Sequence, residues 1–326
     1  MTIPHIAAAI DLGSNTFRLL VAERLEEDFR VLAKRTASVR LGRGLVHSGI
    51  LDEDSMEKGF GVLCTFREAL DHYKPRSIRI CGTEALRRAG NSGLFLRRAA
   101  KIMQHPIDII NGEEEARLCL AGALAGFLTP LSGPLLLVDV GGGSTELVAV
   151  QFPAGEVRTA SVGLGVVGLT EKFLAPSPPD VDGLDNHLAA TLTAVLEDLE
   201  LRRETPPCLI TGCGGTATSM AALDLEMNVY DAARVHGHVL QHGAIRALWE
   251  KMIVLSPGRR NLLPCLGDGR GEILPAGIRT YQVLLRILHL DRLRVSDTGL
   301  LEGILLSCSN AAAFRTFRPG IPARKI

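Results

Sequence analysis

Aromatic residues are scarce in this chain of 326 residues, at 4% of the total, although 46% of its residues are hydrophobic. The core therefore has to be built mainly from Ala, Leu, Val and Ile rather than from large rings. Acidic and basic residues balance at 36 each, so the formal net charge is zero and no global field attracts nucleic acid or a membrane surface. Any anion binding must come from a local arrangement of donors.

Long hydrophobic runs and paired cysteines are also missing. The most apolar stretches are interrupted by Gly, Pro or a charge well before the ~18 residues that a membrane span requires. The N-terminal sequence MTIPHIAAAID lacks the basic region and the long apolar run of a secretory signal. Seven cysteines occur without a C-x-x-C pair, which suits a reducing compartment better than a disulfide framework or a zinc site. We expect a cytoplasmic protein that contacts neither nucleic acid nor membrane.

One pattern occurs twice in the chain. AIDLGSNTFRLLVA and LVDVGGGSTELVAV share an apolar strand that ends in Asp, a turn of small polar residues, and a second apolar strand. Each predicts a β-hairpin, and the two Asp residues, Asp11 and Asp139, are 128 positions apart. The similarity suggests an internal duplication, in which the Asp-bearing turns of two related domains could face one another across a cleft.

Strand and helix patterns alternate through the rest of the chain, whose length alone favours two domains. LTPLSGP, at 128–134, has the composition of an inter-domain linker, and the basic tail FRPGIPARKI is expected to fray. Helices are expected to dominate from about residue 241. Earlier helical spacing covers 52–73, 94–104, 113–127 and 184–200, and strand patterns cover 77–81, 106–110 and 208–210.

The second hairpin carries the strongest chemical signal, DVGGGSTE at 139–146. Three glycines allow backbone N–H groups to approach a ligand closely, and a concave row of such donors suits phosphate oxygens. Ser144 and Thr145 add hydroxyl groups, while Asp139 and Glu146 supply the hard oxygens that Mg²⁺ prefers. The alternative is a glycine-rich turn with two surface carboxylates, but three glycines exceed what a two-residue hairpin needs.

TGCGGT, at 211–216, is another strand followed by a glycine-rich turn, and here the turn opens a helix. Free N–H groups and the positive end of the helix dipole favour an anion at such a turn. The segment matches neither a Walker loop nor the G-x-G-x-x-G fingerprint. The segment supports a phosphate site mainly because it is the third turn of small residues that follows the end of a strand.

IINGEEEARL, at 109–118, holds three consecutive glutamates. Asn111 can cap the helix, Glu114 occupies the capping-box position, and acids favour a helix N-terminus. The other interpretation is that one glutamate acts as a general base toward water. Spacing alone leaves both interpretations open.

GTEALRRAGN, at 82–91, places Arg87 beside Arg88. Adjacent helical residues point about 100° apart, so at most one of the two is expected to face a site. Arg suits bidentate binding of phosphate, and a solvated helix face is the competing interpretation.

The histidines of VHGHVLQH include His238 and His242, one helical turn apart, but no nearby acid completes a metal site there.

The three turns and the repeated Asp resemble the actin and sugar-kinase ATPase superfamily, and within it the exopolyphosphatase/guanosine pentaphosphate phosphohydrolase (Ppx/GppA) family. That resemblance implies an α/β fold of two related actin-like, ribonuclease H-like domains with a central cleft. It implies domains at 1–128 and 129–299, with 300–326 packing back on the first, as in the short two-domain members. The segments that carry it are AAIDLGSNTFRLLVAE, VRLGRGL, GTEALRRA, IINGEEEARL, LLLVDVGGGSTELV, SVGLGVVGLTEKF, TGCGGTATSMAAL, GRGEILPAGI and SDTGLLEGIL.

The resemblance also implies roles for individual residues. Glu115 matches the proposed general base, and Asp139 and Glu146 match acids that bind Mg²⁺, or another divalent cation, and orient water. Asp11 is expected as a further metal ligand. The residues expected to bind phosphate or substrate are Ser14, Asn15, Thr16, Arg18, Arg87, Gly141, Gly142, Gly143, Ser144, Gly214, Gly215 and Thr216.

The activity implied by the resemblance is hydrolysis of a terminal phosphoanhydride, with inorganic polyphosphate as substrate and orthophosphate as product. Guanosine pentaphosphate (pppGpp) is the alternative substrate. Two rivals belong to other classes: an ATP-dependent kinase, since the fold is shared, and a non-catalytic sensor of (p)ppGpp or polyphosphate. The acids at 115, 139 and 146 argue against a sensor, which needs no carboxylates placed for water. The family is compatible with a homodimer, which no segment of the sequence specifies.

Overall fold

The computed structural model describes residues 5–25, 29–127, 134–151, 156–201, 209–266 and 269–308. The chain divides into two compact units, residues 1–128 together with 298–326, and residues 129–297. The expected linker (except Pro134) and the C-terminal tail lie outside the described residues. None of the helices in these ranges combines the length and the hydropathy of a membrane span.

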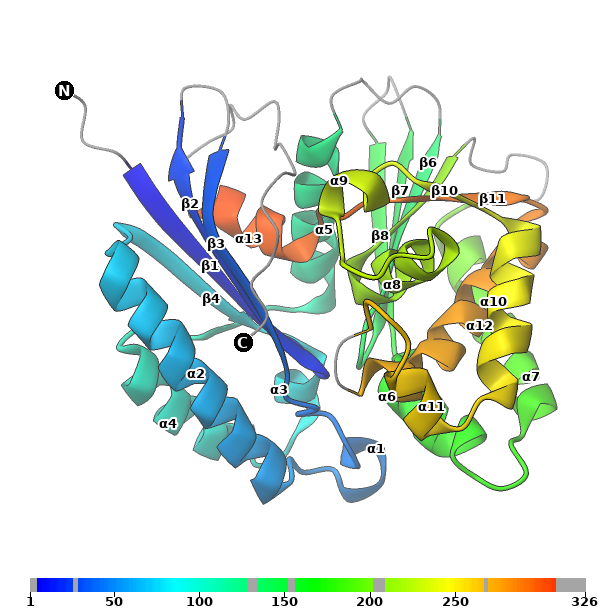
Figure 1. Cartoon of the computed structure of the whole chain (residues 1–326), viewed down its shortest axis with the longest axis horizontal. Coiled ribbons are helices and arrows are strands. Elements are labelled where there is room, and N and C mark those ends of the chain that lie inside the picture. The colour runs from blue at the N-terminus through cyan, green and yellow to red at the C-terminus, as the bar shows by residue number, and fades with distance from the viewer. Residues whose placement is uncertain are drawn as a thin grey trace. The chain divides into compact units, whose positions relative to one another are not determined.

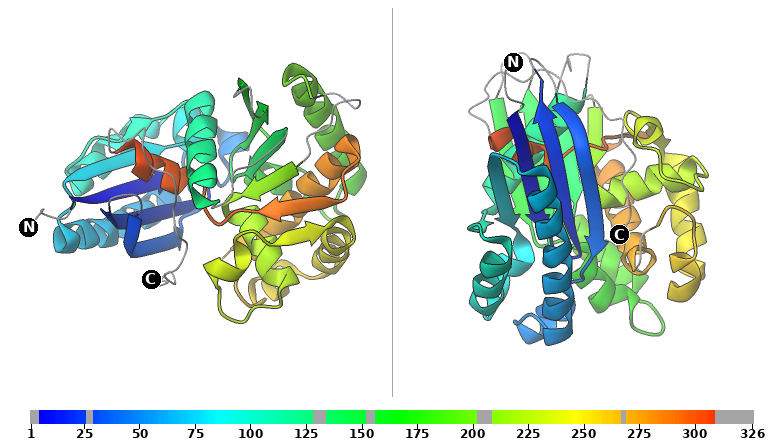
Figure 2. Two further views of the ribbon diagram at one scale, coloured as in Figure 1. Left: turned by 90° about the horizontal axis from the view of Figure 1, so that it is seen from above. Right: turned by 60° about the vertical axis from the view of Figure 1, so that its left-hand side comes forward.

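The N-terminal unit is built on a mixed sheet with strand order β3-β2-β1-β4-β5 (Figure 1). β1 to β3 are antiparallel neighbours, which both views of Figure 2 show as long strands side by side, and β4 and β5 run parallel to β1. The strands are β1 (His5–Leu12), β2 (Thr16–Arg24), β3 (Phe29–Ser38), β4 (Ser77–Gly82) and β5 (Asp108–Ile109).

The two faces of this sheet belong to different cores, because successive strand residues point to opposite sides. Ala8 and Ile10 of β1 pack with residues of α2 (Glu53–Tyr73) and α4 (Ser92–Met103). Ala7 and Ala9 pack with α13 (Leu300–Ser307) on the other face. Figure 1 shows these helices on opposite sides of the sheet. The remaining helices of the unit are α1 (Leu45–Ser48), α3 (Glu84–Arg88) and α5 (Gly112–Gly126).

Glycines allow α13 to pack directly on α5. A Cβ atom at Gly303 would overlap the carbonyl oxygen of Leu118, and one at Gly122 would overlap the carbonyl oxygen of Gly299. Neither helix backbone could come so close with a larger residue at these positions. Helix α13 is thereby fixed to the N-terminal unit.

The C-terminal unit has a six-stranded mixed sheet with order β10-β11-β9-β6-β7-β8. Its strands are β6 (Leu135–Val140), β7 (Thr145–Gln151), β8 (Glu156–Val162), β9 (Leu209–Cys213), β10 (Val239–Gln241) and β11 (Arg292–Val295). Its helices are α6 (Val166–Leu169), a π-helical turn (Thr170–Leu174), α7 (Val181–Asp198), α8 (Gly214–Asp224), α9 (Ala232–Val235), α10 (His242–Val254), α11 (Pro257–Asn261) and α12 (Arg270–Leu288).

The two units repeat one strand plan, which confirms the predicted α/β fold of two related domains. The order β3-β2-β1-β4-β5 corresponds to β8-β7-β6-β9-β11. Asp11 lies opposite Arg18 on the antiparallel neighbour and beside Cys81 on the parallel one. Asp139 likewise lies opposite Glu146 and beside Cys213. The similarity seen in the two hairpins thus extends to a third strand.

Most predicted elements are present, but four strands were missed. β3 and β8 are largely half-buried and rich in polar residues, so neither presents an apolar run. β10 and β11 are short strands, and β11 lies in the region where helices were expected to dominate. The strand predicted at 106–110 is also shorter than expected, because only Asp108 and Ile109 pair with β4.

Candidate active site

The glycine turn between β6 and β7 is held in place by the start of α6. The amide of Gly141 donates to the carbonyl of Ser144 at 2.9 Å, which closes the turn. The carbonyls of Gly141 and Gly142 accept from Val166 and Val167, each at 3.0 Å. Because C=O and N–H point oppositely across a trans peptide, the amides of Gly142 and Gly143 point away from α6. Such fixed backbone donors suit an anion.

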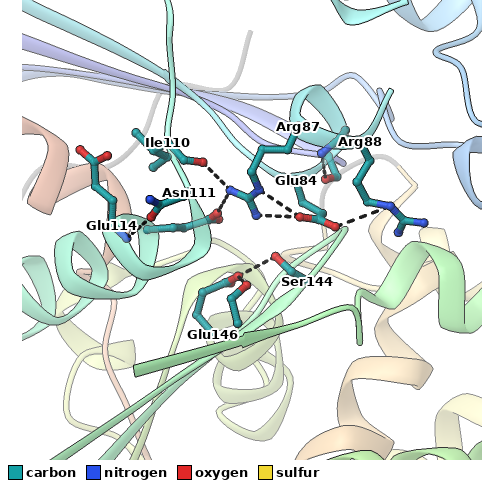
Figure 3. A network of polar contacts seen from close by, with 12 residues as sticks. Glu84, Arg87, Arg88, Ile110, Asn111, Glu114, Ser144 and Glu146 are labelled. Carbon is teal, nitrogen blue, oxygen red and sulfur yellow. Dashed lines mark hydrogen bonds and ion pairs between the residues drawn. The ribbon is translucent and has the colours of Figure 1, made fainter. Parts of the chain in front are cut away.

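Two buried carboxylates flank the turn of this hairpin. Asp139 and Glu146 are directly opposite each other in the register, and their relative exposures are 8% and 3%. Oε1 of Glu146 accepts hydrogen bonds from Ser144 Oγ at 2.6 Å and Ser161 Oγ at 2.8 Å; Figure 3 shows the first. Ser144, expected to bind phosphate, therefore also orients an acid. The pair offers hard oxygens of the kind that Mg²⁺ prefers.

The turn that opens α8 adjoins the same strand. Gly214 has a φ of +74°, in the left-handed region, and a Cβ atom there would overlap Oδ1 of Asp139. The hydroxyl of Thr216 donates to the carbonyl of Val140 at 2.7 Å. A Cβ atom at Gly277 of α12 would overlap the Thr216 side chain, so α12 packs tightly against this turn. The turn is therefore fixed between β6 and α12.

Sequence reasoning missed Arg270, the first residue of α12. A Cβ atom at Gly215 would overlap Nη1 of Arg270, and the same nitrogen lies 3.4 Å from Ser219 Oγ. The guanidinium thus lies against the α8 turn predicted to bind phosphate. The available signal was the segment GRGEILPAGI, whose arginine follows a glycine at a helix start, but no local pattern links it to residue 215.

The equivalent turn of the N-terminal unit has the same closing bond, from the amide of Gly13 to the carbonyl of Thr16 at 3.2 Å. Asn15 Nδ2 donates to Thr16 Oγ1 at 3.2 Å. The carbonyl of Ser14 accepts from Gly42 at 2.7 Å, and its hydroxyl accepts from the amide of Ala85 at 3.2 Å. Of the three residues expected to bind phosphate, Ser14 is thus held by Gly42 and by the first turn of α3, and the carbonyl of Asn15 accepts from the amides of Val39 and Arg40.

Asp11 differs from Asp139 in its partner. Arg18 approaches Oδ2 of Asp11 through Nε at 2.7 Å and Nη2 at 2.6 Å. Complete burial raises the pKa of Asp11, and the Arg18 charge opposes that rise. Arg18 and Asp11, predicted as a phosphate contact and a metal ligand, are therefore paired with each other. Where the N-terminal unit has a salt bridge, the C-terminal unit has two acids.

The three consecutive glutamates at the start of α5 have separate environments. Asn111 caps the helix by accepting from the amide of Glu114 at 2.8 Å, as predicted. Glu113 pairs with Arg117 on the surface, and Glu114 pairs with Arg79. Glu115 alone is buried, with 7% relative exposure, and its Oε2 accepts from Nη1 of Arg87 at 2.7 Å.

Arg87 and Arg88 diverge, as helix geometry predicts, and Figure 3 shows Glu84 between them. Nη1 of Arg87 also donates to the carbonyl of Ile110 at 2.7 Å. Its Nε and Nη2 donate to Oε2 of Glu84 at 3.1 and 2.8 Å. Arg88 is half-exposed, with Nε 3.7 Å from Glu84. Of the two arginines, Arg87 is the one joined to Glu115.

The comparison with protein families gives this arrangement a context. The model of the Ppx/GppA phosphatase family matches residues 20–311. The chain belongs to the Ppx/GppA phosphatase family. The Ppx/GppA resemblance carried by the sequence segments is thereby confirmed, over a range that includes Glu115 and both acids of the second hairpin.

Curated members of the Ppx/GppA family share about 30% of their residues with this chain. A putative exopolyphosphatase of Haemophilus influenzae is 30% identical over 309 residues, covering 92% of this chain and 90% of the relative. Exopolyphosphatase 2 of Mycobacterium tuberculosis is 29% identical, covering 92% and 97%. A guanosine-5'-triphosphate,3'-diphosphate pyrophosphatase of Vibrio vulnificus is 29% identical, and the alignment covers 91% of this chain but 58% of the relative.

A solved structure of a Ppx/GppA family member from Aquifex aeolicus superimposes with a TM-score of 0.75 at 32% identity, covering 94% of this chain and 97% of that one. An exopolyphosphatase from Cytophaga hutchinsonii, at 23% identity, has a TM-score of 0.84 and shows the shared fold. The two-unit plan described above is thus that of the Ppx/GppA family.

The histidine segment outside these motifs requires a correction. His238 precedes β10 and His242 is the first residue of α10, so the two are not one helical turn apart as predicted. An acid does stand nearby: Oδ2 of Asp224 lies 2.7 Å from Nε2 of His238. The sequence spacing failed because a short strand interrupts the segment, and Asp224 comes from the end of α8.

Proposed function

We propose that this chain is a Mg²⁺-dependent exopolyphosphatase, which hydrolyses the terminal phosphoanhydride of inorganic polyphosphate and releases orthophosphate. The main support for the proposal is that only one of the three consecutive glutamates is buried. Glu115 is buried and joined to an arginine, whereas Glu113 and Glu114 are used in surface ion pairs. A buried carboxylate with a fixed orientation is suited to proton transfer.

Each unit contributes groups to the proposed reaction. In the C-terminal unit, the amides of Gly142 and Gly143 and the α8 turn with Arg270 would bind the phosphoryl oxygens. Asp139 and Glu146 would hold Mg²⁺. The bound ion would supply charge compensation for the phosphoryl oxygens. In the N-terminal unit, the Ser14–Thr16 turn would add further donors to phosphate.

Glu115 would take a proton from the attacking water as its oxygen bonds to the terminal phosphorus. The bond from that phosphorus to the bridging oxygen breaks, and the bridging oxygen remains on the shortened polyphosphate. Orthophosphate is the second product. The backbone donors stabilise charge on the transferred group because they are fixed before the reaction. With water as the acceptor, no kinase substrate is required.

The relatives include both exopolyphosphatases and a guanosine-5'-triphosphate,3'-diphosphate pyrophosphatase, so pppGpp 5'-phosphohydrolysis is the second candidate function. The matched exopolyphosphatases are covered over 90% and 97% of their lengths, whereas the Vibrio pyrophosphatase is covered over 58%. Alignment over nearly the full length of two exopolyphosphatases supports polyphosphate as the first candidate substrate.

The test measures phosphate release with Mg²⁺ from long polyphosphate, short polyphosphate and pppGpp in parallel. The proposal predicts release from polyphosphate at the highest kcat/KM. Release from pppGpp alone would assign the second candidate. Binding of these compounds with no release would indicate a non-catalytic sensor. Transfer from ATP to an acceptor pool, without free phosphate, would indicate a kinase.

A further inference from the structure

The guanidinium of Arg87 is enclosed by acceptors on two sides. Two of these acceptors are the carboxylates of Glu84 and Glu115, and both residues belong to the N-terminal unit. One edge of the guanidinium, formed by Nε and Nη2, is bound by Oε2 of Glu84. Nη1 is bound by Glu115 and by the carbonyl of Ile110. Arg has five N–H donors, so this arrangement engages four of them and fixes the plane of the group.

Glu84 reaches Arg87 because the two residues are three positions apart on α3. A helix-stabilising pair on a solvated surface would be the ordinary explanation. The low exposure of these side chains indicates a role beyond helix stabilisation. Arg87, Glu84 and Glu115 are only 16%, 17% and 9% exposed. Buried charges interact far more strongly than exposed ones, because water screens them less.

Among the neighbouring charges, Glu84 is the second carboxylate bound to Arg87, beside Glu115. On α5, Glu113 and Glu114 have their own cations in Arg117 and Arg79, and Arg79 also contacts Asp108 of β5. On α3, Arg88 is half-exposed and lies 3.7 Å from Glu84. Arg87 therefore lies between two largely buried carboxylates, those of Glu84 and Glu115. Burial opposes, and both carboxylates support, the charged form of Arg87, whose pKa is raised.

We infer that Glu84 is a positioning residue for the reaction: it holds Arg87 against Glu115 and keeps Glu115 basic enough to accept a proton. The inference rests on the proposed function, in which Glu115 receives the proton of water. A carboxylate paired with an uncompensated arginine is stabilised in its charged form and becomes a weaker base. Because Glu84 compensates part of the positive charge of Arg87, the loss of basicity at Glu115 is limited.

The first variant is Glu84→Gln, which removes the charge but keeps an oxygen that can accept from Nε and Nη2. The acid limb of the kcat–pH profile is expected to move to lower pH by roughly half to one pH unit. The plateau of kcat is expected to fall by about 3- to 10-fold, because a weaker base transfers the proton less well. The thermal unfolding temperature should change little.

Two further variants separate positioning from simple helix stabilisation. Glu84→Asp keeps the charge and should keep the wild-type acid-limb midpoint. Arg88→Gln removes the exposed neighbour of Glu84 and should leave both midpoint and kcat unchanged. If Glu84→Gln lowers the unfolding temperature and activity but leaves the midpoint in place, Glu84 only stabilises α3 and the inference is wrong.

A titration that requires no turnover keeps this test independent of the proposed function. Glutamate labelled with ¹³C at Cδ gives a resonance for Glu115, identified by its loss in Glu115→Gln. The resonance should titrate at lower pH in Glu84→Gln than in wild type. Equal midpoints would overturn the inference even if polyphosphate is hydrolysed. A shifted midpoint in a chain that releases no phosphate would support the control of Glu115 by Glu84 and Arg87 but reject the proposed hydrolase.

Discussion

Glu146 lies directly opposite Asp139 on the neighbouring antiparallel strand, at the position where the N-terminal unit has Arg18 opposite Asp11. The exchange of a cation for an anion changes what the strand pair can bind. Arg18 compensates the charge of Asp11 within the protein. Under the proposed function, the two acids at the equivalent place would hold a divalent cation, which would bring the compensating charge with it.

Replacement of Glu146 by Gln is therefore expected to weaken Mg²⁺ binding more than ~10-fold and to abolish most phosphate release. The amide keeps an oxygen that can accept from Ser144 and Ser161, so folding should be retained. Calorimetric titration with Mg²⁺ measures the change. Glu156→Gln, an exposed change on β8, serves as the control. Unaltered Mg²⁺ affinity in both Glu146→Gln and Asp139→Asn would place the metal elsewhere.

Arg270 provides a second test, because its guanidinium lies at the α8 turn. Arg270→Met keeps much of the side-chain volume and removes the charge-assisted donors. We expect kcat/KM for polyphosphate to fall about 10- to 100-fold. Arg270→Lys should recover part of the loss, since it restores a charge but not the planar fork. Arg259→Met, an exposed change on α11, is the matched control. Equal losses in the two Met variants would show that Arg270 has no specific role.

The packing of α13 on α5 predicts a stability difference between two glycines. Gly303→Ala brings a methyl group onto the carbonyl of Leu118 and should lower the free energy of unfolding by ~2 kcal/mol or more. Gly61 lies in α2 with open space around it. Gly61→Ala should raise the free energy of unfolding by about 0.5–1 kcal/mol. Urea denaturation compares the two, and a Gly303→Ala protein as stable as wild type would contradict the close helix contact.

The cysteines differ in expected reactivity. Burial raises the pKa of Cys81 to about 12, so at pH 8 its thiol stays protonated in the folded protein. Cys64 is exposed on α2. Brief treatment with iodoacetamide at pH 8 should alkylate Cys64 and spare Cys81, and unfolding in urea should make both reactive. Peptide mass spectrometry reads the result. Rapid labelling of Cys81 in the native protein would contradict its burial in the β1–β4 pair.

Local features of the site could be predicted from the sequence because their causes are local. Asp11 and Asp139 each end an apolar strand before a turn of small residues, and Asn111 stands at the start of a helical pattern. Such signals depend on a few neighbouring residues. The family resemblance then supplied Glu115, which spacing could not separate from Glu113 and Glu114.

Tertiary contacts account for what the sequence could not provide. Arg270 lies at Gly215, 55 positions away in the chain, and no periodic pattern records that approach. Glu115 is joined to α3 through Arg87, and Glu84 binds the other edge of the same guanidinium. Neither contact can be read from the spacing of these residues in the sequence. Strands β3 and β8 were missed because tertiary packing, rather than an apolar run, determines their conformation.

The most direct test of the account compares phosphate release from long polyphosphate, with Mg²⁺, by wild type, Glu115→Gln and Glu114→Gln. The account predicts that Glu115→Gln loses roughly 10²- to 10⁴-fold in kcat while polyphosphate binding persists. Glu114→Gln, which changes the adjacent glutamate paired with Arg79, should retain near wild-type release. Equal rates for wild type and Glu115→Gln would contradict the assignment of Glu115 as the base.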